Sequence, residues 1–217
     1  MPMRPAAEHD PRFRDWCSRL ALAGTQILEV NSYSAIRRGD RVFAALVDTV
    51  LKSADGEVLP RCMLLRGDTV VVVPILDCEG MAGPRTLMVE QFRPIDGENT
   101  LEFVGGMIDD GESPTACAVK EVREEIGLHV RPDELISLHH EPIRVCTAMM
   151  DEHAYFFAFR QSLTAEEARA LDGKSLGELS DGESITVRLV DFDTVALQPV
   201  FSAQVGLNLI RPLLTAR

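Results

Sequence analysis

A short acidic segment near the middle of the chain limits what this sequence can fold into. It contains Glu112, Glu121, Glu124 and Glu125. At about 3.6 residues per turn, Glu121 and Glu125 share one face of a helix, with Glu124 beside them. Like charges at these spacings repel one another. A divalent cation such as Mg2+, which prefers carboxylate oxygens, would supply the missing positive charge. The segment therefore predicts a helix that presents a metal site.

Capping signals predict where this helix begins and ends. Ser113 followed by Pro114 is typical of an N-cap and a first helical position, and Gly127 of the left-handed residue after the last turn. Apolar residues recur between them at helical spacing: Ala116, Val119, Val122 and Ile126. Gly105 and Gly106, just before the segment, permit a backbone that bulkier residues would resist and leave room for a carbonyl to approach a cation. We expect a short capped helix whose opposite side is buried.

The spacing of this segment resembles the Nudix box, G-x5-E-x7-R-E-U-x-E-E-x-G-U, in which U is a large aliphatic residue. The matching positions are Gly106, Glu112 and the run Lys120-Glu121-Val122-Arg123-Glu124-Glu125-Ile126-Gly127-Leu128. The one departure is Lys120, where the family usually has an arginine that orients the glutamates. Lysine keeps the charge but loses the planar fork that grips a carboxylate with two bonds. The resemblance implies a Nudix fold and Mg2+ or Mn2+ as cofactor.

Strand and helix signals elsewhere predict an α+β protein, arranged as an α/β/α sandwich with a mixed sheet. The valine-rich run 69–76 has the pattern of a buried central strand, and 86–92 that of its neighbour. Further strands are expected at 26–33, 42–52, 61–66, 101–104, 135–141, 153–159 and 184–190, and helices at 12–23, 165–171 and 200–214. We expect a small β-rich N-terminal extension, residues 1–65, followed by a Nudix hydrolase domain, residues 66–217.

Composition argues against several classes of function. A net charge of −12 on 217 residues disfavours binding to a nucleic-acid backbone, which needs a basic stripe. No run approaches the roughly 18 apolar residues that span a bilayer, and the first residues lack an apolar signal segment. Five scattered cysteines without a CxxC pair predict reduced thiols and a cytoplasmic setting. His139, His140, Cys146 and His153 match no structural zinc pattern. We therefore expect neither a nucleic-acid nor a membrane partner.

Outside the box, the chain is similar to the branch of the family that acts on nucleoside diphosphate-sugars. Glu90-Gln91-Phe92-Arg93 followed by residues 101–109 looks like the E-Q-x-R … E-x-x-x-G segment of ADP-sugar diphosphatases. Residues 171–190 are similar to plant-type ADP-glucose and UDP-glucose pyrophosphatases. The similarity implies metal-dependent hydrolysis of the diphosphate bond of an ADP-ribose, ADP-glucose or UDP-glucose type of substrate. The products would be a nucleoside monophosphate and a sugar 1-phosphate.

The resemblance also assigns roles to individual residues. The metal ligands would be the carbonyl of Gly105 and the carboxylates of Glu112, Glu121 and Glu125. The catalytic acids would be Glu112, Glu124 and Glu183, the last as general base, with Asp181, Asp151 and Glu152 as alternatives. The substrate would be bound by Arg66, Arg93 and Glu102. For Arg93 the alternative is a surface ion pair with Glu90 or Glu102.

Three questions stay open in the sequence. Relatives that prefer ADP-ribose usually carry an S-P-G turn where this chain has residues 146–152, so the preferred base is undetermined. The same fold hosts isopentenyl diphosphate isomerases, whose cysteine and glutamate motifs are not found here, and catalytically silent modules that sense a nucleotide-sugar. Residues 1–65 form too few strands to be stable alone. They are expected either to pack on their own chain or to build a homodimer and help form the partner's substrate site.

Overall fold

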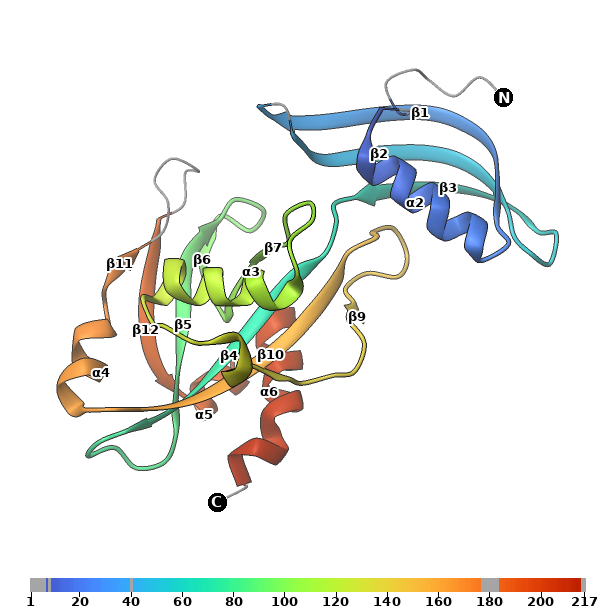
Figure 1. Ribbon diagram of the computed structural model, residues 1–217. Helices are drawn as coiled ribbons and strands as arrows, with labels where there is room; N and C mark the ends of the chain where they lie inside the picture. Colours follow the sequence, from blue (N-terminus) through green and yellow to red (C-terminus); the bar gives the residue numbers. More distant parts are fainter. Residues whose placement is uncertain (1–6, 8, 40, 177–183, 216–217) are drawn as a thin grey trace. The chain divides into compact units, whose positions relative to one another are not determined.

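The chain divides into two compact units, drawn in Figure 1. The computed structural model describes residues 7, 9–39, 41–176 and 184–215. The first of the two units, which we call the N-terminal unit, comprises Met1–Asp68 and Arg144–His153. The second, which we call the core unit, comprises Thr69–Ile143 and Ala154–Arg217. The segment 144–153 therefore groups with the N-terminal unit, whereas the sequence-based division assigned it to the second domain.

In the N-terminal unit a helix covers one face of an antiparallel sheet. The elements are α2 (Pro11–Leu22), β1 (Gln26–Arg38), β2 (Arg41–Lys52) and β3 (Val58–Leu65), and the strand order is β1-β2-β3. Phe13 and Trp16 of α2 are buried in one hydrophobic cluster with Val47 and Leu65 of the sheet. The helix and the strands expected from the sequence are confirmed, although the strands extend further than predicted.

Asp10 ties this helix to the sheet. Its buried carboxylate caps α2 by accepting the Arg12 N–H at 2.9 Å, and it also accepts the hydroxyl of Tyr33 on β1. Burial raises the pKa of Tyr33, and the hydrogen bond to Asp10 and its negative charge raise it further. One side chain thereby fixes both the start of the helix and its position on β1.

The segment 144–153 joins the N-terminal unit through the end of β3. The Leu64 N–H donates to the Met149 carbonyl at 2.7 Å, and the Asp151 N–H donates to the Leu64 carbonyl at 3.2 Å. The Asp151 carboxylate accepts the Arg66 N–H at 2.7 Å. Pairing between residues so distant in the chain has no local signal, which explains why the sequence did not predict this grouping.

The sheet of the core unit is mixed. Its strand order is β11-β12-β5-β4-β10-β8, and β6, β7 and β9 pair with β5, β4 and β10. The strands are β4 (Thr69–Cys78), β5 (Arg85–Arg93), β6 (Glu98–Glu102), β7 (Val104–Met107), β8 (Ile136–Ser137), β9 (Ile143–Arg144), β10 (His153–Leu163), β11 (Ser175–Leu176) and β12 (Ile185–Asp191). β4 and β10 are parallel, whereas β4–β7, β5–β6 and β5–β12 are antiparallel.

β4 is the central strand that its valine run predicts, since seven consecutive residues from Val70 to Leu76 are buried. Pro74 lies in the middle of this strand, where a missing N–H would normally break a ladder. β4 pairs with β7 through Thr69–Val72 and with β5 at Leu76, so Pro74 falls where β4 changes partners. The proline is tolerated because the antiparallel ladder is already interrupted there.

Helices cover both faces of this sheet (Figure 1), which confirms the α+β sandwich. The helices are α3 (Pro114–Glu121), η1 (Val122–Ile126), η2 (Pro132–Glu134), α4 (Ala165–Leu171), α5 (Phe192–Ala196) and α6 (Phe201–Thr215). Val70 and Val72 of β4 belong to one buried cluster with Cys117 and Val122 of the α3–η1 segment. Val73 faces Gly206 of α6. No helix in the described part of the chain is both long and apolar enough to cross a bilayer.

One predicted strand is much shorter than expected. Of residues 135–141, only Ile136–Ser137 form a strand. The chain then turns, because the Ser137 hydroxyl donates to the His139 carbonyl at 2.9 Å and His139 Nδ1 lies 2.7 Å from the Glu141 carbonyl. Side chains that hydrogen-bond to nearby backbone compete with a ladder.

Gly206 should be required for the close packing of α6 on the sheet. A Cβ there would lie 2.8 Å from the ring of Phe103 and 3.1 Å from Val73 Cγ2. Alanine gains about 1 kcal/mol of helix propensity, but overpacking costs about 1–3 kcal/mol. We expect Gly206→Ala to lower the Tm by about 2–4 °C in calorimetry. Asn208→Ala, at an exposed position of the same helix, should keep or raise the Tm. A higher Tm for Gly206→Ala would contradict this account.

Candidate metal and catalytic site

The predicted boundaries of the acidic helix are confirmed, but its second half is not α-helical. The Ser113 hydroxyl accepts the Ala116 N–H at 3.2 Å, Pro114 is the first helical residue, and Gly127 closes the segment with φ +70°. Residues Val122–Ile126 form a π-helix. Such wide turns occur often at functional sites. The 3.6-residue period therefore does not hold through Glu124 and Glu125.

Two glycines of β7 let the strand approach its neighbours closely. A Cβ on Gly105 would collide with the Val70 carbonyl of β4, and one on Gly106 would collide with the Glu121 carboxylate. The predicted need for glycine at both positions is thus explained by contacts within the protein. The absence of a side chain at Gly106 brings Glu121 directly against β7.

Glu125 is connected to the same strand. Its side chain is buried, with 6% of the residue exposed, and Oε2 accepts the Gly105 N–H at 2.9 Å. Burying a carboxylate without a hydrogen bond or a charge partner is costly. Two predicted metal ligands, Gly105 and Glu125, are therefore adjacent. Their contact is made by the N–H of Gly105, and the ligand role of its carbonyl stays a prediction.

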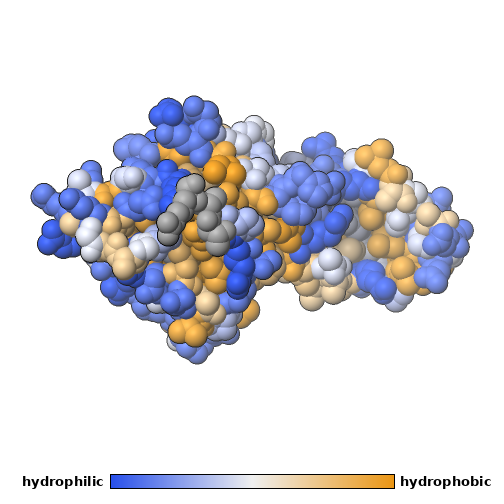
Figure 2. Space-filling model, turned by 90° about the horizontal axis from the view of Figure 1, so that it is seen from below, coloured by the Kyte–Doolittle hydropathy of each residue, from blue (hydrophilic) through white to orange (hydrophobic). Residues whose placement is uncertain are grey.

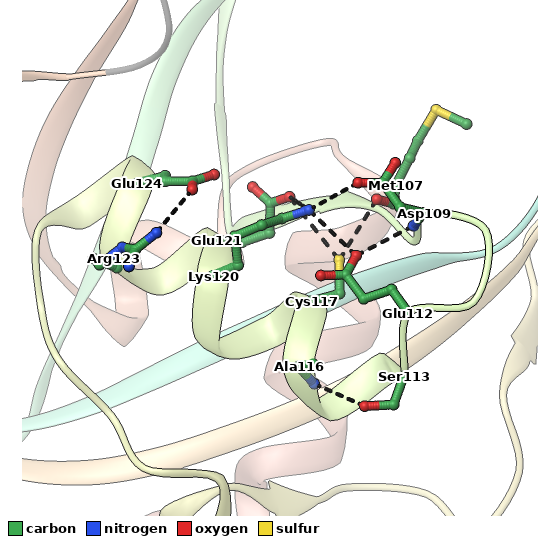
Figure 3. Close-up of polar contacts among 10 residues, drawn as sticks. All are labelled: Met107, Asp109, Glu112, Ser113, Ala116, Cys117, Lys120, Glu121, Arg123 and Glu124. Carbon is green, nitrogen blue, oxygen red and sulfur yellow. Dashed lines mark hydrogen bonds and ion pairs between the residues drawn. The ribbon is translucent and has the colours of Figure 1, made fainter. Parts of the chain in front are cut away.

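Lys120 lies among three carboxylates (Figure 3). Its Nζ is 3.2 Å from Glu112 Oε2, 3.3 Å from Asp109 Oδ2 and 4.0 Å from Glu121 Oε1. Burial lowers the pKa of Lys120, but the hydrogen bonds to Glu112 and Asp109 outweigh burial and the pKa is raised. The lysine therefore remains charged and neutralises part of the acidic cluster.

Asp109 was not singled out from the sequence. It contacts Lys120 from the loop between β7 and α3. The one signal in the sequence was Lys120 at the position where the box usually has arginine. A lysine ammonium has three donors and can bind more than one carboxylate, so a second acidic partner could have been expected.

Cys117 is a neutral thiol beneath this cluster. Its Sγ lies 3.5 Å from the Met107 carbonyl and 4.0 Å from Glu121 Oε1. Burial raises the pKa of Cys117 to about 12, with further contributions from the charges of Glu121 and Glu112. A thiol that stays protonated is a poor nucleophile and a poor metal ligand.

Glu124 extends from the π-turn and contacts Arg123 (Figure 3). Its carboxylate is 3.2 Å from Arg123, on a more exposed part of the π-turn. Its predicted catalytic role is neither supported nor opposed by this contact. Glu183 and Asp181, the first candidates for the general base, lie outside the described residues.

The donor chemistry of this site suits a hard divalent cation. The carboxylates of Glu112, Glu121 and Glu125 and the carbonyl of Gly105 all offer oxygen, which Mg2+ prefers. Within the described ranges, no three His, Cys, Asp or Glu side chains are grouped so that they could hold a metal ion as they stand. Lys120 is instead hydrogen-bonded to Glu112 and Asp109. The residues fit a metal by their chemistry, and their role as ligands stays a prediction.

Arg93 and Glu102 form the ion pair that was the alternative to a phosphate clamp. Arg93 Nε and Nη2 lie 2.7 and 2.9 Å from the two carboxylate oxygens of Glu102, on the β5–β6 hairpin. Burial raises the pKa of Glu102, but hydrogen bonds from Arg93 and Thr100 outweigh burial and lower it. Glu90 pairs with Arg188 instead, at 2.6 Å. Arg93 is therefore held in a fixed orientation by Glu102.

Arg66 belongs to the other unit. Its Nη1 is 3.0 Å from Glu152, whose side chain is 7% exposed. Asp151 accepts hydrogen bonds from the backbone of Arg66 and Gly67 and from the Arg19 guanidinium. The two alternative bases, Asp151 and Glu152, are thus engaged in contacts inside the N-terminal unit. Glu112, Glu121, Glu125 and Gly105 all lie in the core unit, whereas Arg66 lies in the N-terminal unit.

The chain is similar in sequence to curated proteins. A stretch of 145 residues is 31% identical to the Arabidopsis thaliana protein Nudix hydrolase 14, chloroplastic, covering 63% of this chain and 46% of that protein. A stretch of 60 residues is 45% identical to the ADP-sugar pyrophosphatase of Mus musculus, covering 28% of this chain and 27% of that protein. The chain thus spans less than half the length of these curated relatives.

The fold and the family are also recognised independently. A solved structure described as the crystal structure of ADP compounds hydrolase superposes with a TM-score of 0.57, covering 87% of this chain and 95% of that one. Its 16% identity makes this a likeness of fold alone. The family model for the NUDIX domain matches residues 65–206. Because that match covers more than half of the chain, the protein belongs to the Nudix family.

Proposed function

We propose that this protein hydrolyses the diphosphate bond of a nucleoside diphosphate-sugar, of the ADP-ribose, ADP-glucose or UDP-glucose type, with Mg2+ or Mn2+. The observation that carries the proposal is the position of two box glutamates against β7, with a third bonded to Lys120. Glu121 lies against Gly106, Glu125 is bonded to Gly105, and Glu112 is bonded to Lys120. The mouse relative named ADP-sugar pyrophosphatase supports the choice of substrate class.

Each residue has a defined task in this proposal. Glu112, Glu121, Glu125 and the Gly105 carbonyl would hold the cation. When bound, a divalent cation polarises the phosphates and lowers the pKa of a coordinated water. Glu183 would accept the proton of the attacking water, whose oxygen forms a bond to one phosphorus while the bridging P–O bond breaks. Arg93, oriented by Glu102, would bind a phosphate through its guanidinium.

The proposed activity predicts a metal-dependent product. Purified protein incubated with ADP-ribose, ADP-glucose, UDP-glucose and GDP-mannose in Mg2+ should release a nucleoside monophosphate from at least one of them. EDTA should abolish the release, because the carboxylates alone cannot polarise a phosphate. Chromatography of the nucleotides measures both. Binding of a nucleotide-sugar without any product would instead favour the alternative function, a catalytically silent module that senses nucleotide-sugars.

Glu125→Gln should be the most damaging single change in the acidic set. The amide oxygen of glutamine can still accept the Gly105 N–H, so the fold should be preserved while the charge is lost. We expect kcat to fall by about 10²–10³, as for other preorganised electrostatic groups. Glu166→Gln, an exposed acid of α4 in the same unit, is the matched control and should keep full activity. Equal kcat values for the two variants would refute the assignment.

The same assay separates the general base from the ligands. If Glu183 is the base, Glu183→Gln should lower kcat and leave Mn2+ binding largely unchanged. Near-normal turnover would move the role to Asp181, Asp151 or Glu152.

A homodimer built through the N-terminal unit is the second part of the proposal. One face of its sheet is covered by α2, and the opposite face carries Ile36, Leu46 and Val58, which are 61%, 46% and 57% exposed. Figure 2 shows that hydrophobic residues reach the molecular surface among hydrophilic ones. Soluble homo-oligomers are most often twofold dimers. A second copy would cover this face, and its N-terminal unit would contribute to the substrate site.

Light scattering tests the dimer. The parent chain should have twice the monomer mass of 23.9 kDa. Leu46→Glu places a charge on the exposed sheet face and should shift the mass to that of a monomer, with lower activity. Leu22→Glu, the same change at a 90% exposed position of α2, should leave the dimer intact. A fully active monomeric parent would refute the proposal.

We also propose a reducing, cytoplasmic setting without a nucleic-acid partner. The net charge of −12 supports the second point, and the described cysteines, Cys17, Cys62, Cys78, Cys117 and Cys146, are all free.

A further inference from the structure

Lys120 contacts three carboxylates, and one of them, Asp109, is not among the predicted metal ligands. Asp109 Oδ2 lies 3.3 Å from Nζ, and Glu112 Oε2 lies at 3.2 Å on the same loop. Glu121 Oε1, a predicted ligand, lies further away at 4.0 Å. Figure 3 shows the ammonium between the loop carboxylates and the helix.

A lysine side chain is held less firmly on one carboxylate than an arginine side chain would be at this position. Its ammonium is a compact charge on a flexible four-carbon stem, without the planar fork that fixes a guanidinium on one carboxylate. Nζ already lies at the limit of ion-pair distance from Glu121, at 4.0 Å. If Glu112 were its only loop partner, Nζ could shift closer to Glu121 and compete with a cation for that carboxylate.

The loop presents Asp109 in a defined position. The Glu112 N–H donates to the Asp109 carbonyl at 2.9 Å, and the Asp109 N–H donates to Glu112 Oε2 at 3.2 Å. Gly111 completes the turn with φ +81°. These bonds use only the backbone of Asp109, so replacing its side chain should leave the turn in place. The side chain itself is 46% exposed and directed at Lys120.

We propose that Asp109 is a positioning residue that holds the Lys120 ammonium closer to the loop carboxylates than to Glu121 and thereby limits its competition with a divalent cation for Glu121. The proposal rests on the proposed metal-dependent function. Asp109 and Lys120 together would perform the orienting role that the resemblance assigns to the box arginine. The effect of Asp109 must therefore depend on the residue at position 120.

A double-mutant cycle tests this dependence. Asp109→Asn should raise the Kd for Mn2+, measured by electron paramagnetic resonance without substrate, by about fivefold, within the range for contacting residues. In the Lys120→Arg background the fork can hold Glu112 alone, so the same change should raise the Kd by less than about twofold. kcat, where turnover is detected, should follow the same pattern. Asp110→Asn removes a charge from the adjacent exposed position and should leave both quantities unchanged in either background.

Each result decides the matter. An equal loss in both backgrounds would mean that Asp109 acts directly on the cation, and no loss in the Lys120 background would mean that it does not act at all; either overturns the inference. If the effect of Asp109→Asn on the Kd for Mn2+ depends on residue 120 but no nucleotide-sugar is hydrolysed, the inference is upheld and the proposed substrate class is rejected. If a nucleotide-sugar is hydrolysed but the effect of Asp109→Asn does not depend on residue 120, the inference is rejected and the proposed substrate class is upheld. A parent chain that binds no Mn2+ would overturn both.

Discussion

The hydrogen bond from the Gly105 N–H to Glu125 joins the acidic helix to the sheet, and the arrangement of the site depends on it. Three carboxylates on one short helical segment repel one another, so packing must hold them in place. Buried apolar contacts of Val122 and Ile126 anchor the other side of the segment. The glycines of β7 then allow the helix to approach until Glu121 touches the strand.

Local signals explain most of the fold that the sequence predicted. The cap at Ser113, the left-handed Gly127 and the valine run of β4 depend on residues close together in the chain, and all three are confirmed. The length of the strand after Leu135 was overestimated, because side-chain bonds to the backbone at His139 compete with the ladder. The grouping of residues 144–153 with β3 depends on partners about 85 residues away, which no local pattern encodes.

The site was less predictable than the fold, for physical reasons that differ from residue to residue. The helical period suggested that Glu121 and Glu125 share a face, but the π-turn changes the angle between them. Asp109 was missed because its contact is with Lys120, eleven positions later in the chain. The box pattern fixes the residue type at single positions and does not say which of them contact one another. Arg93 was correctly given two alternatives, since a guanidinium fork suits a carboxylate and a phosphate equally well. The observed partner is Glu102.

The π-turn also restricts how this part of the chain can vary in length. The hydrogen bonds of the π-helix at Val122–Ile126 span five residues instead of four, so this turn holds one residue more than the same stretch of α-helix. Deleting one residue inside the turn would therefore restore ordinary helical geometry and leave the residues beyond it facing the same way. A deletion inside α3 has no wide turn to absorb it and would rotate every later residue by about 100°, which would carry Glu125 away from Gly105. Loss of a single codon is therefore better tolerated in the π-turn than in the helix before it.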